Sequence, residues 1–397
     1  MKRSTFIRLA LGASATLGAS LPPLPALAES GTSIEGAKPT VKDRSLQLEI
    51  ERAIEKGLDF LQSKQDRDSY WSHPEYPAIS ALVLTSYMCE PSGVMKAKPP
   101  EFVEKGYNYL LNCVKPDGGI YGKELANYNT SVSMSALVAA DPVKYASTLS
   151  KAREFIIGQQ GHYPKRNGQS SPYEGGVGYG DDGPHSDISN TAFAIEALRQ
   201  TRDTHYADVS EAKELNWDAA VAFLQRCQNH PEYNKQSWVS GDPQNIGGFV
   251  YDPLESKAGE VTLPNGTKTL RSYGSMSYAG LMSYIYADLK KDDPRVKSVY
   301  DWTLRNYTVE ENPGMGLAGL YYYYHTMSKA LTIYGAEVLP IVGGKQINWR
   351  QDLALKLINL QSSDGFWVNS SGRWWEKDPV LVTSYAVRSL ELIHPGI

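Results

Sequence analysis

Carboxylates gather in the segment between Asp181 and Asp187, directly before a predicted helix that begins near Ser189. A carboxylate that is crowded by like charge, or buried in a dry cavity, keeps its proton to higher pH and can serve as a general acid. Asp187 is therefore a candidate catalytic acid, with Asp182 near enough in sequence to assist it. Asp187 also suits a structural role, because an Asp before a helix caps the free N–H groups of the first turn. The sequence leaves both roles open.

His325 is the second candidate for catalysis, and it follows the run Tyr321–Tyr324 in a predicted helix. A histidine titrates near neutrality and can act as a general base, but no nucleophile partner is apparent beside it. The alternative is a histidine that only lines a cavity or is hydrogen-bonded in the core. Consecutive helical residues point around the whole circumference, so we expect only one or two of the four tyrosines to face any one cavity.

A loop near the C-terminus combines aromatic and charged side chains: Arg373, Trp374, Glu376 and Asp378. The tryptophan and the arginine could stack on a sugar ring or hold an acidic group. In the alternative, Arg373 pairs with Glu376 or Asp378, and the tryptophan covers a helix end. Asp182 and Glu376 together would also supply the two carboxylates that glycoside cleavage needs, although the sequence gives no distance between them.

Six helical repeats must position these residues. In each repeat an amphipathic helix leads into a turn, mostly of glycine and an aromatic residue, and then into a second helix. The spacing of about 50 to 75 residues is typical of arrays of helical hairpins. The first helices are predicted around 54–61, 103–111, 152–160, 219–228, 296–307 and 353–361. The second helices are predicted to begin near 78, 129, 190, 275, 321 and 382.

The repeats resemble the glutamine–tryptophan repeat of squalene cyclases and protein prenyltransferase β subunits. The clearest copies are Phe60-Leu61 with Gln65 and Trp71, and Gln361 with the phrase from Asp364 to Trp367. The resemblance implies an all-α fold, the (α/α)6 toroid, with six inner and six outer helices around an aromatic central cavity. In overall pattern the chain is most similar to single-domain, exported bacterial proteins of the "prenyltransferase and squalene oxidase repeat" type.

In such a ring the inner helices start at one rim, where their first residues converge on the cavity mouth. We expect the ligand-binding residues there, as in other concave sites. Beside the catalytic candidates Asp187 and His325, the predicted set is Asn129, Asp182, Asn190, Tyr273, Ser275, Tyr324, Arg373, Trp374, Glu376 and Asp378.

Both catalytic signatures of the resembled families are incomplete. Asp187 matches the first aspartate of the cyclase DxDD motif, but Ser189 stands where the protonating acid belongs and Asn190 replaces the last aspartate. The segment Tyr273–Ser275 stands where a zinc prenyltransferase has Asp-x-Cys, which leaves His325 without zinc-ligand partners. We therefore expect no zinc-dependent prenyltransferase.

The first 28 residues have a basic start, an apolar run and a small-residue site ending at Ala28. They predict a signal peptide cleaved after Ala28, export to the periplasm or beyond, a linker over 29–45 and a repeat domain over 46–397. Removing the leader takes the formal charge from −4 to −7, which argues against a nucleic-acid partner. No other apolar run is long enough for a membrane span, and no Cys/His cluster predicts a metal or cofactor.

The sequence therefore predicts an exported toroid whose aromatic cavity binds an isoprenoid or another hydrophobic small molecule. If the protein is an enzyme, the resemblance implies a cyclase or isomerase with Asp187 as its acid. The alternative is a carbohydrate-active or glycan-binding toroid. The sequence does not decide between catalysis and binding, and it leaves the oligomeric state open.

Overall fold

A computed structural model describes residues 43–164, 170–180, 185–203, 213–341 and 343–397. The predicted signal peptide lies outside the described residues, as do Asp182 and all but the last three residues of the predicted linker. The first described helix, α1, begins at Arg44 and is capped by Asp43, whose carboxylate accepts a hydrogen bond from the N–H of Leu46.

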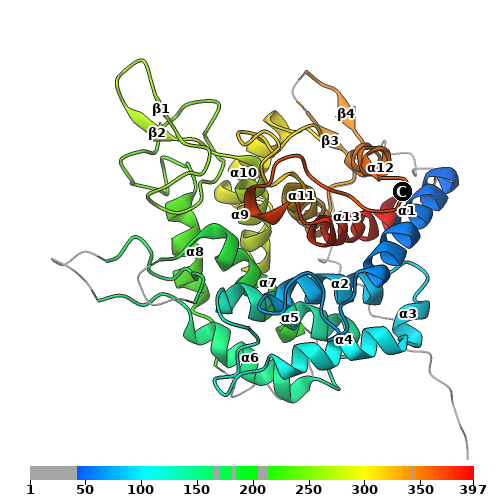
Figure 1. The fold of residues 1–397 in the computed structure, drawn as a ribbon. Coiled ribbons are helices and arrows are strands. Elements are labelled where there is room, and N and C mark those ends of the chain that lie inside the picture. Colours follow the sequence, from blue (N-terminus) through cyan, green and yellow to red (C-terminus); the bar gives the residue numbers. More distant parts are fainter. Residues whose placement is uncertain (1–42, 165–169, 181–184, 204–212, 342) are drawn as a thin grey trace, which may run out of the picture. The chain divides into compact units, whose positions relative to one another are not determined.

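Six helices form a closed inner ring (Figure 1). Each packs against the next along the chain, and the last, α13, packs against the first, α2. These helices are α2 (Pro77–Cys89), α5 (Ala126–Ala140), α7 (Ile188–Asp203), α9 (Gly274–Tyr286), α11 (Leu320–Tyr334) and α13 (Pro379–Ile393). In α2 and α9 almost every residue is buried, as expected for helices that are covered on all sides. The closed ring confirms the predicted toroid.

Six outer helices cover this ring. They are α1 (Arg44–Ser63), α4 (Glu101–Asn112), α6 (Ala146–Gly158), α8 (Trp217–Cys227), α10 (Pro294–Arg305) and α12 (Trp349–Leu360). Most bury one stripe at three- and four-residue steps, such as Ile50, Ile54, Leu58 and Leu61 in α1. Helix α1 packs on both α12 and α13, so the seam between the two ends of the array is closed.

The remaining elements are short and lie in the connections. The strands β1 and β2 form an antiparallel hairpin between α8 and α9, with Val261 opposite Thr269. A second antiparallel pair, β3 and β4, lies between α11 and α12. These elements are α3 (Val94–Ala97), β1 (Glu260–Thr262), β2 (Lys268–Leu270), β3 (Leu339–Pro340), β4 (Gln346–Ile347), η2 (Arg373–Trp375) and η3 (His394–Gly396).

A glutamine at the end of the outer helix links neighbouring repeats. The side-chain amide of Gln228 donates to the carbonyl of Gly247 in its own turn and to that of Arg295 in the next outer helix, at 3.0 and 2.9 Å. Gln361 makes the same pair of bonds to Gly365 and to Ala53 of α1, across the seam. Gln65 and Gln160 do likewise in their repeats. The glutamine of the repeat motif is therefore an inter-repeat hydrogen-bond donor.

The turn glycine allows each turn to approach the next outer helix. Gly175 and Gly247 have φ of +82° and +92°, a region that favours glycine. A Cβ at these positions would lie 2.2 Å from the carbonyl oxygen of Ala219 and 2.1 Å from that of Ser298. Close backbone contact therefore requires glycine at both positions.

A second repeated bond ties the turn to the inner helix. In five repeats the backbone N–H of the residue that follows the turn donates to a Ser or Thr hydroxyl on the inner helix. The donor–acceptor pairs are Trp71–Ser80, Ile120–Thr130, Val177–Thr191, Phe249–Ser277 and Trp367–Thr383. The small hydroxyl residues near the inner-helix starts thus fix the turn that precedes them.

Replacing Gln228 with Ala is expected to destabilise the ring by about 2–4 kcal/mol, because it removes the partner of two backbone carbonyls, one buried and one partly buried, and of the Tyr284 hydroxyl. Chemical denaturation followed by far-UV circular dichroism measures the loss. Gln62→Ala on the exposed face of α1 is the matched control and is expected to change stability by less than about 0.5 kcal/mol. Equal losses for both variants would contradict the inter-repeat role.

Candidate ligand-binding cavity

The inner helices enclose a cavity of about 370 Å³ at the end of the ring where they begin. Every lining residue belongs to the first two turns of an inner helix or to the segment before one. The aromatic members are Tyr76, Tyr128, Tyr179, Phe193, Tyr251, Tyr273, Tyr322, Trp374, Trp375 and Tyr385. The others are Ile79, Leu125, Met276, Leu381, Ser189, Asn190, Ser275 and Glu376. The helix starts therefore converge on one cavity, and its wall is mainly aromatic.

Five residues predicted from the sequence for ligand binding line this cavity: Asn190, Tyr273, Ser275, Trp374 and Glu376. They come from three segments that are far apart in the chain, and the ring brings them together. The remaining predicted residues lie elsewhere, apart from Asp182, which the structure does not describe.

Asn129 and Asp378 hold helix ends. The Asn129 side-chain oxygen accepts a 3.0 Å hydrogen bond from the N–H of Ala78, in the first turn of α2. The Asp378 carboxylate caps α13 by accepting from the N–H of Val380 at 2.8 Å. Neither residue lines the cavity.

Asp187 is fully buried at the start of α7 and does not line the cavity. Its carboxylate accepts from the backbone N–H of Asn190 at 2.9 Å and from the Asn190 side-chain amide at 2.8 Å. His185 Nε2 lies 3.6 Å from Asp187 Oδ2. Burial raises the pKa of the Asp187 carboxyl above its ordinary value, against the opposing effect of the hydrogen bonds from Asn190. The geometry is that of a helix cap whose neighbour, Asn190, reaches the cavity.

Glu376 caps a helix from a distant segment. Its carboxylate accepts from the backbone N–H of Tyr322 at 2.9 Å and of Tyr321 at 3.3 Å, in the first turn of α11. The Asn369 side-chain amide donates to it at 2.5 Å. Burial raises the pKa of the Glu376 carboxyl, while these donors oppose the shift. The only carboxylate on the described cavity wall is therefore largely engaged by protein donors.

His325 is buried in α11 beneath the cavity wall. Its ring lies 5.4 Å, between centroids, from that of Tyr385, which lines the cavity. Burial lowers the pKa of His325 well below its usual range, and the cations Lys329 and Arg388 lower it further. The imidazole is therefore neutral at physiological pH, and its Nδ1 makes no hydrogen bond with the part of the chain that the structure describes.

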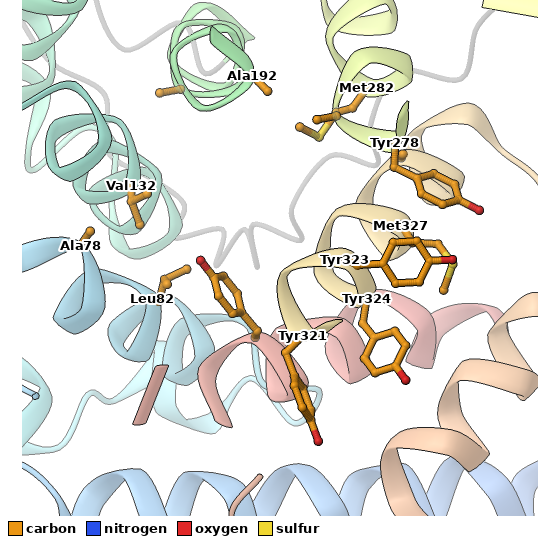
Figure 2. Close-up of a cluster of buried hydrophobic side chains, with 14 of the residues drawn as sticks. Ala78, Leu82, Val132, Ala192, Tyr278, Met282, Tyr321, Tyr323, Tyr324 and Met327 are labelled. Carbon is orange, nitrogen blue, oxygen red and sulfur yellow. The ribbon is translucent and has the colours of Figure 1, made fainter. Parts of the chain in front are cut away.

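Of the tyrosine run, only Tyr322 lines the cavity. Figure 2 shows Tyr321, Tyr323 and Tyr324 pointing from α11 away from the centre of the ring. The Tyr323 hydroxyl donates to the carbonyl of Thr308 at 2.7 Å, and that of Tyr324 donates to the carbonyl of Val309 at 2.5 Å. Tyr324, predicted for ligand binding, thus packs outside the cavity, because a helix presents one residue in three or four to any one side.

Two tryptophans stand at the mouth of the cavity. Trp374 and Trp375 have φ of +55° and +65°, and they keep 45% and 47% of their surface exposed. The Arg373 guanidinium lies over the Trp374 ring at 4.3 Å from its centroid, and Trp375 meets Tyr76 edge-on at 4.7 Å. A left-handed backbone conformation costs about 1–2 kcal/mol for a residue other than glycine. The two tryptophans therefore have a strained backbone conformation, which the surrounding structure maintains.

Several wall residues were missed by the sequence analysis. Tyr179 and Tyr251 follow turn glycines, where the sequence analysis noted an aromatic residue but predicted no contact with the cavity. Phe193 and Tyr385 lie one turn deeper than the helix starts, in the same direction as Ser189 and Leu381. Each lies four residues after a residue at the rim, on the same side of the helix, and this spacing could have identified both from the sequence.

The described residues contain no group of three His, Cys, Asp or Glu side chains that could hold a metal ion. The three cysteines, Cys89, Cys113 and Cys227, are free thiols. Among the described helices, none has the length and apolar character needed to cross a membrane.

No protein-family model matches the chain, and no curated protein matches it in sequence. Solved structures are similar in fold. A variant of the type II terpene cyclase MstE from Scytonema, in its apo form, aligns with a TM-score of 0.54 and 11% identity over 89% of this chain and 99% of its own. Another MstE variant, in complex with geranylgeranyl dihydroxybenzoate, gives 0.53 and 11% over the same shares.

An inactive variant of the α-1,6-mannanase GH76A from Salegentibacter, in complex with α-1,6-mannotriose, is also similar. It aligns with a TM-score of 0.53 and 10% identity over 88% of this chain and 100% of its own. At these identities the likeness shows the fold alone, the α/α toroid, which one neighbour uses for a terpenoid and another for a glycan.

Replacing Asp187 with Asn is expected to change how stability depends on pH. A carboxyl whose pKa is raised by folding favours the protonated state, so wild type loses stability as pH rises above about 4. The variant has no such group, so the melting temperature of wild type minus that of the variant falls as the pH rises above about 4.

Asp293→Asn is the matched control, because the Arg295 hydrogen bonds lower the pKa of Asp293. The ionised form of Asp293 stabilises the fold above the unfolded-state pKa of this group, and this contribution is lost as the pH falls. The melting temperature of wild type minus that of Asp293→Asn is therefore expected to rise with pH, opposite to the difference for Asp187→Asn. Thermal unfolding across the pH series measures both differences. A constant difference for Asp187→Asn would contradict the assignment.

Proposed function

We propose that the protein binds a hydrophobic small molecule of the isoprenoid class in its central cavity. The observation that carries this proposal is the wall itself, in which fourteen of the eighteen lining residues are aromatic or aliphatic. A volume of about 370 Å³ lies within the range that small-molecule sites occupy. Such a wall favours an apolar ligand, because removing apolar surface from water lowers the free energy.

The charge of the wall favours an uncharged ligand. Lys and Arg are missing from the described lining residues, and Glu376 is the only Asp or Glu among them. An anionic head group placed there would be buried without a cationic partner, which is costly. An isoprenoid without a diphosphate therefore suits the site better than a prenyl diphosphate.

Binding requires fewer assumptions than cyclisation. A cyclase must deliver a proton to an alkene in the cavity. Asp187 is buried behind the wall, with Asn190 bonded to it and lining the cavity in its place. The neighbour that holds geranylgeranyl dihydroxybenzoate supports the choice of ligand class for a toroid of this type.

Filling the cavity tests this proposal. Ile79→Trp places a large side chain in the wall and is expected to lower the affinity for geranylgeraniol at least about tenfold. Tryptophan and tyrosine fluorescence measures binding, and mass spectrometry of an organic extract identifies any lipid retained by the purified protein. Leu355→Trp, at an exposed position of α12, is the control and should bind as wild type does. Unchanged affinity in Ile79→Trp would exclude the cavity as the site.

A glycan is the second candidate, and the exposed tryptophan pair favours it. The faces of Trp374 and Trp375 at the cavity mouth are surfaces on which a sugar ring can stack. A toroid of similar fold binds α-1,6-mannotriose. Against hydrolysis, Glu376 and Asp187 serve as helix caps. The carboxylate predicted to pair with Glu376, Asp182, lies outside the described residues.

Thermal unfolding with and without α-1,6-mannotriose tests this second candidate. Glycan binding at the mouth would raise the melting temperature of wild type, and Trp374→Ala would abolish the shift because the stacking surface is gone. The absence of a shift at millimolar oligosaccharide, for this and other glycans, would count against the carbohydrate function.

A further inference from the structure

A buried serine on the cavity wall is hydrogen-bonded by an asparagine from another segment. Ser275 lies in the first turn of α9, lines the cavity and is 3% exposed. Asn312 lies in the connection between α10 and α11 and is fully buried. The Asn312 amide nitrogen is 3.3 Å from the Ser275 hydroxyl oxygen. The direction of this bond decides what the serine can offer to a ligand.

Two backbone groups fix the orientation of the Asn312 amide. Its side-chain oxygen accepts a 2.9 Å hydrogen bond from the N–H of Ser275, which requires an acceptor at that position. Its nitrogen donates to the carbonyl of Ala318 at 3.0 Å, which requires a donor. The second hydrogen on this nitrogen is therefore the one that reaches the Ser275 hydroxyl oxygen, because an amide nitrogen does not accept.

The Ser275 hydroxyl thus accepts from Asn312 and keeps its own proton. No residue in the described part of the chain takes that proton. Hydrogen bonds in a chain polarise one another, so the bond from Asn312 makes the serine a stronger donor. A buried donor that finds no acceptor costs free energy. A ligand that brings an acceptor to this part of the wall would satisfy it.

Other hydroxyls on the wall pair with each other. Ser189 pairs with Tyr322 at 3.3 Å, and Tyr128 pairs with Tyr385 at 3.4 Å. In each pair either hydroxyl can be the donor, so one proton is used inside the wall. Ser275 differs from them because its partner is an amide nitrogen, which leaves the serine proton for the cavity.

We propose that Ser275, oriented by Asn312, donates a hydrogen bond to a carbonyl oxygen of the ligand, so that the cavity selects a hydrophobic carbonyl compound. A carbonyl oxygen accepts and brings no proton that the mainly apolar wall would have to satisfy. Lys and Arg are missing from the described wall, which favours a neutral carbonyl over a carboxylate. Asn312 acts through Ser275 and is a positioning residue. This inference rests on the proposed function and adds the ligand's polar group to it.

The test compares farnesylacetone, an isoprenoid methyl ketone, with the alkene in which a methylene group replaces the carbonyl oxygen. Both compounds have nearly the same shape, and only the ketone has an acceptor. Wild type is expected to bind the ketone about tenfold more tightly, because the alkene leaves the buried Ser275 donor unpaired. Titrations followed by the fluorescence of Trp374 and Trp375 at the cavity mouth give both affinities.

Ser275→Ala removes the donor and is expected to reduce the preference for the ketone to less than about twofold. Asn312→Asp keeps the acceptor for the N–H of Ser275, but its carboxylate also accepts the serine proton and so withdraws that proton from the ligand. It is expected to reduce the preference equally, and it keeps the inference testable if Ser275→Ala does not fold. Ser283→Ala is the matched control and should retain the wild-type ratio, because the Ser283 hydroxyl donates to the carbonyl of Ala279 outside the cavity.

Equal affinity of wild type for the ketone and the alkene would overturn this inference and leave the proposed function standing. An undiminished preference in Ser275→Ala or Asn312→Asp would overturn it as well, because another group would then recognise the carbonyl. So would an equal loss of preference in Ser283→Ala, since the effect would not be specific to Ser275. If wild type bound neither compound, the proposed function itself would fail, and the inference with it.

Discussion

The free backbone N–H groups at the starts of the inner helices are the constraint on which this structure depends. Each helix leaves its first N–H groups without partners inside the helix, and the ring brings six such starts to one end of the molecule. Side chains satisfy them in five helices: Asn129 serves α2, Asp187 serves α7, Asn312 serves α9, Glu376 serves α11 and Asp378 serves α13. Three of these caps come from outside the helix that they serve, so capping also joins one segment of the ring to another.

This use of polar groups explains the character of the cavity. Carboxylates and amides near the rim lie at the positive ends of the helices. Each carboxylate accepts from two or three donors, and the amide oxygens of Asn129 and Asn312 accept from one each. The wall between them is left to tyrosine, phenylalanine and tryptophan, whose rings pack on each other, as Tyr128 does on Phe193 at 5.0 Å. An apolar cavity with a polar but engaged rim follows from closing a ring of helices that all start at the same end.

The repeat pattern predicted an array of helical hairpins, since apolar spacing, turn glycines and small hydroxyl residues recur together. Closure into a toroid was predicted from the resemblance to the squalene cyclase repeat, because periodicity alone does not distinguish a closed ring from an open array. The sequence could also place the inner-helix starts to within a few residues, and so it found Asn190, Tyr273, Ser275 and Glu376 at the cavity. It could not separate a rim residue that faces the cavity from one that faces the next helix. That choice depends on the rotation of each helix about its axis, which packing across the ring determines. Asn129 and Tyr324 were placed at the ligand for this reason, whereas Tyr251, within a turn, was overlooked.

The contact between Gln361 and Ala53 joins residues that are 308 positions apart, and Gln47 reaches the carbonyl of Ile397 across the same seam. A loop of this length closes only when nearly the whole chain has been made, so earlier segments form an arc whose end repeats lack a neighbour. The cavity exists only after closure, because α2 and α13 lie next to each other in its wall. A molecule that occupies the cavity therefore binds only the closed ring. By mass action, its binding would stabilise the contact between the two ends of the arc.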